Sequence, residues 1–206
     1  MRHRHDLVSL LVTFLASALY AVTGQAAGDP AKGQAASAMC GACHGPDGNS
    51  MIPANPKLAG QHAAHIAKQL KDFKSGARKN PIMAPMAVAL SDDDMNHIGA
   101  YFAGQKPQAG AARDAASVEL GRKLFRGGNA SRGIAACSGC HLPNGAGMPS
   151  QYPRLAGQHA DYTVAQLKAF RSGERNNDPA AVMRTLAANL TDAEIESLAQ
   201  YVAGLK

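Results

Sequence analysis

Two short segments of this chain carry a pair of thiols followed directly by an imidazole, at one fixed spacing. They are Cys40-Gly41-Ala42-Cys43-His44 and Cys137-Ser138-Gly139-Cys140-His141, and they contain all four cysteines of the sequence. In a C-x-x-C-H segment, both thiols form thioethers to the vinyl groups of a porphyrin and the histidine reaches its iron. The two segments therefore predict two covalently bound haem c groups and one-electron redox chemistry.

Other uses of paired cysteines fit this pattern less well. Zinc ribbons separate their two pairs by about 15–20 residues, a far shorter gap than the one seen here. A thioredoxin-like dithiol needs a strand–helix–strand setting, which the sequence does not suggest. Structural disulfides would not require a histidine after both pairs. We therefore favour haem attachment over these alternatives.

The sequence contains an internal duplication. With the two motifs in register, at a shift of 97 residues, 15 of the 25 positions from 56 to 80 are identical. Three extra residues enter the second copy around 177–181, and the shift then becomes 100. A period of this length is too long for a solenoid repeat, so each copy is predicted to be a domain.

Each copy has a helical pattern, and no alternating strand pattern is convincing. Helices are expected over 31–40, 62–74, 118–125 and 159–171, from apolar residues at helical spacing and glycines at the ends. Ser91-x-x-Asp94 and Thr191-x-x-Glu194 are capping-box sequences that begin the last helix of each copy. We predict an all-α fold of two tandem cytochrome c-type domains. They occupy 27–107 and 118–206, joined by a linker over 108–117.

The N-terminus predicts export. A basic start, an apolar run over 7–22 and small residues before position 27 are typical of a cleaved signal peptide over 1–26. The run is shorter than the ~20 residues that span a bilayer, which disfavours the alternative of a retained anchor. No arginine pair suggests the twin-arginine route. A Sec-type signal and a periplasmic location agree with covalent haem attachment.

Composition limits the partners. The formal charge of +6 includes two arginines and one aspartate of the predicted signal, and haem propionates would offset much of the remainder. No run of five like charges exists, so nucleic acid is not expected as a partner. We expect redox proteins as partners, together with peripheral membrane association.

The second axial ligand of each iron is expected to recur in both copies. Two methionine pairs do so, Met51 with Met148 and Met83 with Met183. The first pair lies seven residues after the motif histidines and is interpreted as packing at the haem edge. Met83 and Met183 follow a helix and a loop that let the chain cross to the opposite haem face. We predict them as ligands because methionine closes the iron site for electron transfer. Met86, which has no methionine counterpart, is the main rival in the first copy.

Two histidines in the repeated Gln-His-Ala segments offer a further alternative. His62 and His159 would give bis-histidine irons. Both stand at the expected start of a helix, where a capping or solvent-exposed histidine is commoner than a ligand.

These residues resemble the dihaem cytochrome c4 family over essentially the whole mature chain. Each half shows the class I cytochrome c pattern: C-x-x-C-H, Pro-x-Leu-x-Gly, a distal methionine, and a last helix bearing an aromatic residue. Gly-Pro-Asp-Gly-Asn-Ser after the first motif and Phe-Arg-Gly-Gly before the second resemble this family in particular. The resemblance implies two cytochrome c folds related by a pseudo-twofold axis.

The resemblance also implies roles for particular residues. His44 with Met83 and His141 with Met183 would be the iron ligands. The carbonyls of Pro56 and Pro153 would accept a hydrogen bond from the proximal imidazoles and fix their orientation. Arg78 and Arg175 occupy matched positions and are candidates for contacts with the haem propionates, an ordinary surface arginine being the alternative.

For function, the resemblance implies an electron carrier between a quinol-oxidising cytochrome bc complex and a terminal oxidase. The first alternative is a dihaem subunit bound to a periplasmic oxidoreductase, as in flavocytochrome c. The second is a dihaem peroxidase, which would need an open or displaceable iron ligand. The repeated methionine pair argues against the peroxidase.

Overall fold

A computed structural model describes residues 28–206 of the chain. The predicted signal peptide over 1–26, and with it the alternative of a retained anchor, lies outside the described residues. Within 28–206 the regular structure is helical, and the only β-type pairing consists of two isolated bridges. No helix in this part of the chain is long and apolar enough to cross a membrane. The predicted all-α class is confirmed.

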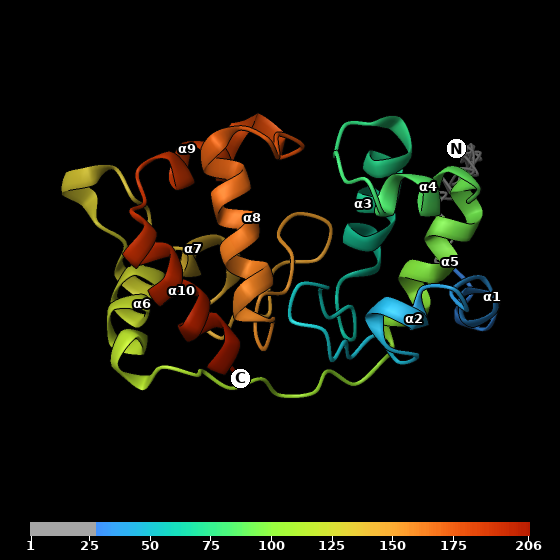
Figure 1. Ribbon diagram of the computed structural model, residues 1–206, viewed down its shortest axis with the longest axis horizontal. Helices are drawn as coiled ribbons and strands as arrows, with labels where there is room; N and C mark the ends of the chain where they lie inside the picture. Colours follow the sequence, from blue (N-terminus) through green and yellow to red (C-terminus); the bar gives the residue numbers. More distant parts are fainter. Residues whose placement is uncertain (1–27) are drawn as a thin grey trace, which may run out of the picture.

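The chain forms two helical domains side by side, joined by one extended segment that runs along the edge of the molecule (Figure 1). The first domain contains five helices: α1 (Pro30–Ala36), α2 (Gly41–His44), α3 (Ala63–Ser75), α4 (Met83–Val88) and α5 (Asp92–Ala103). The second contains α6 (Ala115–Gly127), η1 (Ala130–Arg132), α7 (Ser138–His141), α8 (Ala160–Ser172), η2 (Pro179–Ala181), α9 (Val182–Ala188) and α10 (Asp192–Gly204). The order of the helices repeats, as the duplication predicts.

Local sequence signals set most helix ends. Ser91 and Thr191 cap α5 and α10. The hydroxyl of each accepts a hydrogen bond from the backbone N–H three residues later, and the carboxylate of that later residue, Asp94 or Glu194, accepts one from the backbone N–H of the capping residue. The helices α3 and α8 both end at a glycine in the left-handed region, Gly76 at φ 79° and Gly173 at φ 78°. Only glycine takes this conformation at little cost, so both helices stop at the same place in the repeat.

The junction between the domains differs from its predicted form. Helix α6 begins at Ala115, inside the segment 108–117 that we expected to be linker. The reason is Asp114, whose side chain accepts a hydrogen bond from the Ala116 N–H and caps the helix. The rest of the connection is also held, because the Gln108 N–H donates to Asn49 at 2.8 Å and the Arg113 N–H to Gln200 at 2.7 Å.

In each domain the first helix crosses the last one at a glycine. A Cβ added at Gly33 of α1 would lie 1.9 Å from the His97 carbonyl oxygen, and one added at Gly121 of α6 would lie 2.0 Å from that of Ser197. Backbones therefore touch at both crossings, which only a residue without a side chain allows. Beneath each crossing lies an apolar core, built around Phe102 in the first domain and Phe125 in the second.

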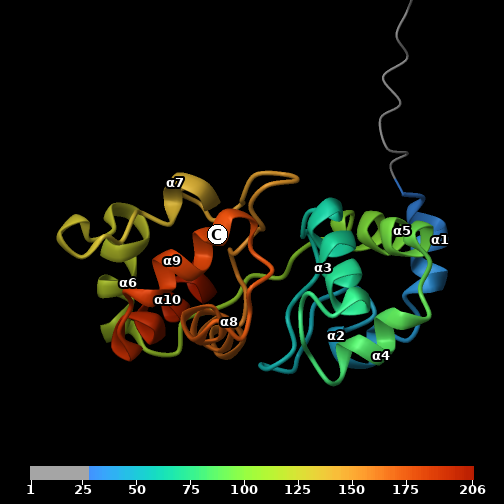
Figure 2. The same ribbon diagram turned by 90° about the horizontal axis from the view of Figure 1, so that it is seen from above.

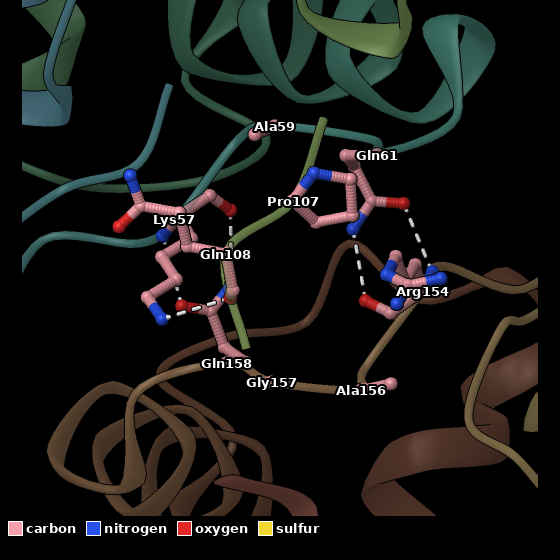
Figure 3. A pocket seen from close by; sticks show the side chains of 9 residues that line it. All are labelled: Lys57, Ala59, Gln61, Pro107, Gln108, Arg154, Ala156, Gly157 and Gln158. Atoms are coloured by element: carbon pink, nitrogen blue, oxygen red, sulfur yellow. Dashed lines mark hydrogen bonds between the residues drawn. The ribbon is translucent and has the colours of Figure 1, made fainter. Parts of the chain in front are cut away.

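Two glutamines join the domains by reciprocal hydrogen bonds (Figure 3). Gln61 donates to the Arg154 carbonyl and accepts from the Arg154 N–H, both at 2.9 Å. Gln158, its counterpart in the repeat, donates to the Lys57 carbonyl at 3.0 Å and accepts from the Lys57 N–H at 2.9 Å. Each side chain thus pairs with the other domain's backbone as a strand would, and the two sets of bonds follow the pseudo-twofold symmetry.

Candidate haem sites

The thiols of both motifs lie on single helical turns. Cys40 and Cys137 are the N-caps of the four-residue helices α2 and α7, and the second cysteine and the histidine follow on the same turn. No disulfide joins the four cysteines of the motifs. Burial raises the pKa of Cys40, and that of Cys137 to about 11. A buried setting of this kind is the opposite of the electropositive surroundings that activate the thiolate of a redox dithiol.

The two proximal histidines have the same surroundings. His44 and His141 are buried, and the Nδ1 atom of each lies 2.9 Å from a proline carbonyl oxygen, that of Pro56 or Pro153. Since a carbonyl can only accept, Nδ1 carries the proton and donates it, which leaves Nε2 with a free lone pair. Burial lowers the pKa of both imidazoles, while the proline carbonyl acts in the opposite direction.

The free nitrogen of one histidine tests whether the site fits a metal. The Nε2 atom of His141 is buried without a hydrogen-bond partner among the described residues. Buried polar atoms are nearly always paired, so an imidazole nitrogen with an unused lone pair requires a hydrogen-bond donor or a metal ion that binds it. Iron of a covalently attached haem meets this requirement, and the donor set of two thiols and one neutral imidazole on each turn fits the same group.

A repeated loop places the proline carbonyls. In the first domain the Gly48 carbonyl accepts from the N–H groups of Leu58 and Ala59, at 2.7 and 3.1 Å. In the second, Gly145 accepts from Leu155 and Ala156 at 2.8 and 3.1 Å. The segment that carries Pro56 or Pro153 is thereby tied back to the residues just after the motif, so that the same carbonyl faces the imidazole in both domains.

The predicted distal ligands, Met83 and Met183, lie on the short helices α4 and α9, which follow α3 and α8 in the chain. Met83 is the first residue of α4, and its N–H donates to the Asn80 side chain at 2.8 Å, which fixes the start of the helix. Its side chain is partly buried and packs against the first core. Met183 lies in the first turn of α9 and is partly buried as well.

The rival residues have different surroundings. Met86 and Met51 are exposed, whereas Met148 is partly buried. His159 is engaged at the interface, where its Nε2 atom lies 2.8 Å from the Ser50 carbonyl oxygen of the first domain. His62 occupies the matching N-cap position of α3, and its Nε2 atom, like that of His141, is buried without a hydrogen-bond partner among the described residues. Because the Nε2 atom of its counterpart His159 is engaged, this pair does not present a free nitrogen in both domains. These positions favour Met83 and Met183 as ligands in our proposal.

The two arginines considered for propionate contacts lie at the domain interface. The Arg78 guanidinium donates to Gln69 of its own domain at 2.9 Å and to Gln166 of the other at 2.7 Å. Arg175 donates to the same two oxygens, at 2.9 Å to Gln166 and 3.1 Å to Gln69. Burial and the neighbouring Arg78 charge lower the pKa of Arg175 to about 10.

The positive charge of this arginine pair is not matched by acidic side chains. The ion pairs within residues 28–206 involve other basic groups. Each guanidinium instead stacks on a phenylalanine of its own domain, with 4.6 Å from Arg78 to the Phe73 ring centre and 4.4 Å from Arg175 to that of Phe170. Two partly desolvated cations side by side favour a nearby anion, so contact with propionates stays a proposal for both arginines.

Two features of the site were not anticipated from the sequence. The Gln61 and Gln158 bonds across the interface were missed, although both residues stand in the longest repeated stretch, which was a usable signal. Tyr152 packs edge-on against His141, with ring centres 5.8 Å apart, and Asn55 takes its place in the first domain. The Asn55 amide donates to the Cys43 carbonyl instead, at 3.1 Å. No sequence signal marked this difference.

Comparison with known proteins shows which family has this architecture. The family model for cytochrome c matches residues 30–106 and again 118–206. Cytochrome c4 of Azotobacter vinelandii is 47% identical over 97% of this chain and 98% of its own. The crystal structure of reduced cytochrome c4 from Pseudomonas stutzeri superposes with a TM-score of 0.85 at 48% identity, and covers 87% of this chain and all of its own.

A second group of relatives bears another name. A thiosulfate dehydrogenase electron acceptor of Stutzerimonas stutzeri is 42% identical over 82% of this chain and 80% of its own. The cytochrome c4 relatives are electron-transfer proteins rather than enzymes, which confirms the expected class of activity. With two matched domains, two C-x-x-C-H turns and two covalently bound haem c groups, the chain belongs to the dihaem cytochrome c4 family.

Proposed function

We propose that this dihaem electron carrier works in the periplasm, where it accepts electrons from a quinol-oxidising complex and delivers them to a terminal oxidase. The observation that carries the proposal is the repeated, buried histidine that donates to a proline carbonyl, His44 to Pro56 and His141 to Pro153. We propose Met83 and Met183 as the sixth ligands that close the two sites. A haem c held in this way supplies a reversible ferrous–ferric couple. Methionine as the sixth ligand raises the potential and leaves no position for substrate.

The chain's own residues prepare the sites for transfer without rearrangement. The hydrogen bonds to Pro56 and Pro153 fix the imidazole tautomer and ring orientation before any electron arrives. The clamps of Gln61 and Gln158 hold the two domains in one arrangement. A fixed environment lowers the reorganisation that each transfer requires, because the groups facing the metal do not move.

A redox titration of the purified protein, followed by absorbance, tests this function. We expect two one-electron waves, and the red-edge methionine-to-iron band in both oxidised sites. Loss of that band from one site would refute the closed ligand set in that domain. Binding of cyanide or peroxide to either site without displacement of methionine would point to an enzyme instead.

Single substitutions then assign the first-domain ligand. Met83→Ala should keep both haems attached, abolish half of the methionine band and lower one potential. Met86→Ala serves as the matched control, since it lies one helical turn away and is exposed. If Met86→Ala removes the band and Met83→Ala does not, the assignment to Met83 is wrong.

A second candidate function is that of an electron-accepting subunit of a periplasmic oxidoreductase. This candidate includes the flavocytochrome c-like alternative, and the relatives named thiosulfate dehydrogenase electron acceptor favour it. Purification from the native host separates the two proposals. Stoichiometric recovery with a dehydrogenase or flavoprotein would favour the subunit, whereas recovery alone, with rapid oxidation by oxidase-containing membranes, would favour the free carrier.

A further inference from the structure

One asparagine of the repeat has different roles in the two copies. Asn80 and Asn177 occupy matched positions before the segments that carry Met83 and Met183. The Asn80 side chain accepts hydrogen bonds from the N–H groups of Ile82 and Met83, at 2.9 and 2.8 Å, and so caps the start of α4. The hydrogen bonds of Asn80 within residues 28–206 all lie in its own domain. The start of α4 is therefore held by the first domain alone.

Asn177 binds the other domain instead. Its amide donates to Gln69 at 3.0 Å and to Asp72 at 2.5 Å, and its carbonyl oxygen accepts from Lys68 at 3.0 Å. All three partners lie on α3, and Figures 1 and 2 show α3 and α8 on the facing sides of the two domains. We call the contacts of Asn177 with Lys68, Gln69 and Asp72 the interdomain clasp.

The clasp occurs once, although the chain is duplicated. In the register of the repeat, the counterparts of Lys68 and Asp72 on α8 are Ala165 and Ala169, which have no polar side chain. The first-domain asparagine therefore has neither group to bind at the matching place. The extra residues of the second copy also follow Asn177. Both sides of the interface thus depart from the symmetric arrangement at this point.

The extra residues connect the clasp to α9. The Asp178 carboxylate accepts from the Arg184 backbone N–H at 3.0 Å and from the Arg184 guanidinium at 2.7 Å. The Asp178 side chain is 4% exposed, so little water competes for these bonds. Asp178 directly follows Asn177 in the chain. Neighbouring residues therefore bind the first domain and hold the first turn of α9, which carries Met183.

The backbone between these two anchors is strained. Ala180 at φ 52° and Ala181 at φ 57° both lie in the left-handed region, which is costly for a residue with a Cβ. Such conformations persist only where the surrounding structure holds the segment in place. Here the clasp holds one end, and the bonds of Arg184 hold the other. Release of the clasp lets the segment relax, and Met183 moves with it.

We propose that Asn177 is a positioning residue for the second redox site. It makes the position of Met183 depend on contact with the first domain, whereas the position of Met83 depends on its own domain. The second iron then keeps its methionine firmly only while the two domains are docked. This inference rests on the proposed carrier function, with a methionine as the sixth ligand in both sites.

Competition with imidazole in the oxidised, haem-loaded protein tests this role. Added imidazole displaces methionine from the iron, and loss of the methionine-to-iron band gives a half-saturating concentration. Met83→Ala and Met183→Ala backgrounds each leave one band, so the two sites are read separately. Asn177→Ala should lower the half-saturating concentration of the second site about tenfold or more and leave the first unchanged, since residues that hold a metal ligand typically contribute about 10- to 100-fold. Asn80→Ala should do the reverse.

A change in the first domain gives the sharpest test. Asp72→Ala removes a clasp partner on α3, yet it should weaken the methionine of the second site as Asn177→Ala does. Asp72→Asn keeps an oxygen that accepts from Asn177 and should restore wild-type competition, which separates the hydrogen bond from the charge. Asp93→Ala is the matched control, because Asp93 is an exposed aspartate on α5 of the same domain, and it should change neither site.

Hydrogen exchange gives a readout that does not involve the iron. The Arg184 amide donates to Asp178 and should exchange faster in Asn177→Ala and in Asp72→Ala. The Ala84 amide of α4 donates to the Asn80 carbonyl, and its exchange should stay unchanged in both variants.

Three results would overturn the positioning role. The first is wild-type competition and exchange in both variants. The second is an equal loss at both sites, which would show general loosening of the protein. The third is an effect of Asn177→Ala without one of Asp72→Ala, which would make the role local to the second domain. A methionine band that is present at the second site but insensitive to the clasp rejects this inference alone, whereas its absence from the wild type rejects the closed carrier site and the inference with it.

Discussion

Replacing Gln61 with alanine should loosen the contact between the domains. Gln61 is 8% exposed and makes three hydrogen bonds through its side chain, two with the Arg154 backbone across the interface and one from the His62 N–H at 2.9 Å. An intramolecular hydrogen bond contributes about 1 kcal/mol net, so their loss should lower the free energy of unfolding by about 3 kcal/mol. Refilling of the site by water would reduce this figure.

Two measurements check the prediction. Guanidinium unfolding of the haem-loaded protein gives the change in stability, and hydrogen exchange of the Arg154 amide reports the interface itself, because that N–H donates to Gln61. We expect exchange of this amide to accelerate by tenfold or more. Gln151→Ala is the matched control, since Gln151 is exposed in a turn, and a surface change of this kind stays within about 0.5 kcal/mol. A loss below about 0.5 kcal/mol with unchanged Arg154 exchange would refute the reasoning.

The second clamp adds a test of coupling. Gln158→Ala removes the symmetric bonds to Lys57 and should cost a similar amount. Both clamps close the same interface, so opening one weakens what the other holds, and the double variant should lose less than the sum of the single losses. Full additivity would mean that the two sites act locally and that the domains are held together elsewhere.

Three further predictions concern the sites, the helix crossings and the interface. Met183→Ala should lower one midpoint potential in a redox titration and leave the other, so that together with Met83→Ala it assigns both waves; a shift of both waves would count against separate sites. Gly33→Ala and Gly121→Ala should each lower the thermal midpoint by several degrees, corresponding to about 1–3 kcal/mol of overpacking, since the new methyl would meet a backbone carbonyl; an unchanged midpoint would show that the helices can separate freely. His65 is kept neutral by burial first and by nearby arginines second, which lowers its pKa to about 3. The unfolded chain takes up this proton below about pH 6.5 and the folded one does not, so stability should fall as the pH drops from there toward 3, and His65→Gln should flatten that slope in pH-dependent unfolding.

Much of the sites could be predicted from local sequence, for a physical reason. A C-x-x-C-H motif places both thiols and the imidazole on one turn wherever it occurs, and the turn is present in α2 and α7. The capping boxes at Ser91 and Thr191 likewise act over four residues. Such features depend on neighbours in the chain, and the repeat allowed each to be checked against a second copy.

The interface could not be predicted in the same way. Gln69 in the middle of α3 and Arg78 just after this helix are polar residues for which the usual expectation is a solvated surface, yet both are buried and hydrogen-bonded to the other domain. Which faces of two similar folds meet depends on shape and on pairing across the interface, and no periodicity in one copy encodes it. The signal that existed was the repetition of Gln61 and Gln158, two polar residues at the same place in both copies.

Comparing the two copies also separates shared requirements from individual tasks. What recurs in both domains serves folding and haem attachment: the motif turn, the histidine bond to proline, the glycine at the helix crossing and the glutamine clamp. What differs lies where neither folding nor attachment needs it, as with the exposed Val88 against Ala188. Single exposed apolar side chains are normal on soluble proteins, so a difference of this kind leaves the shared fold unchanged.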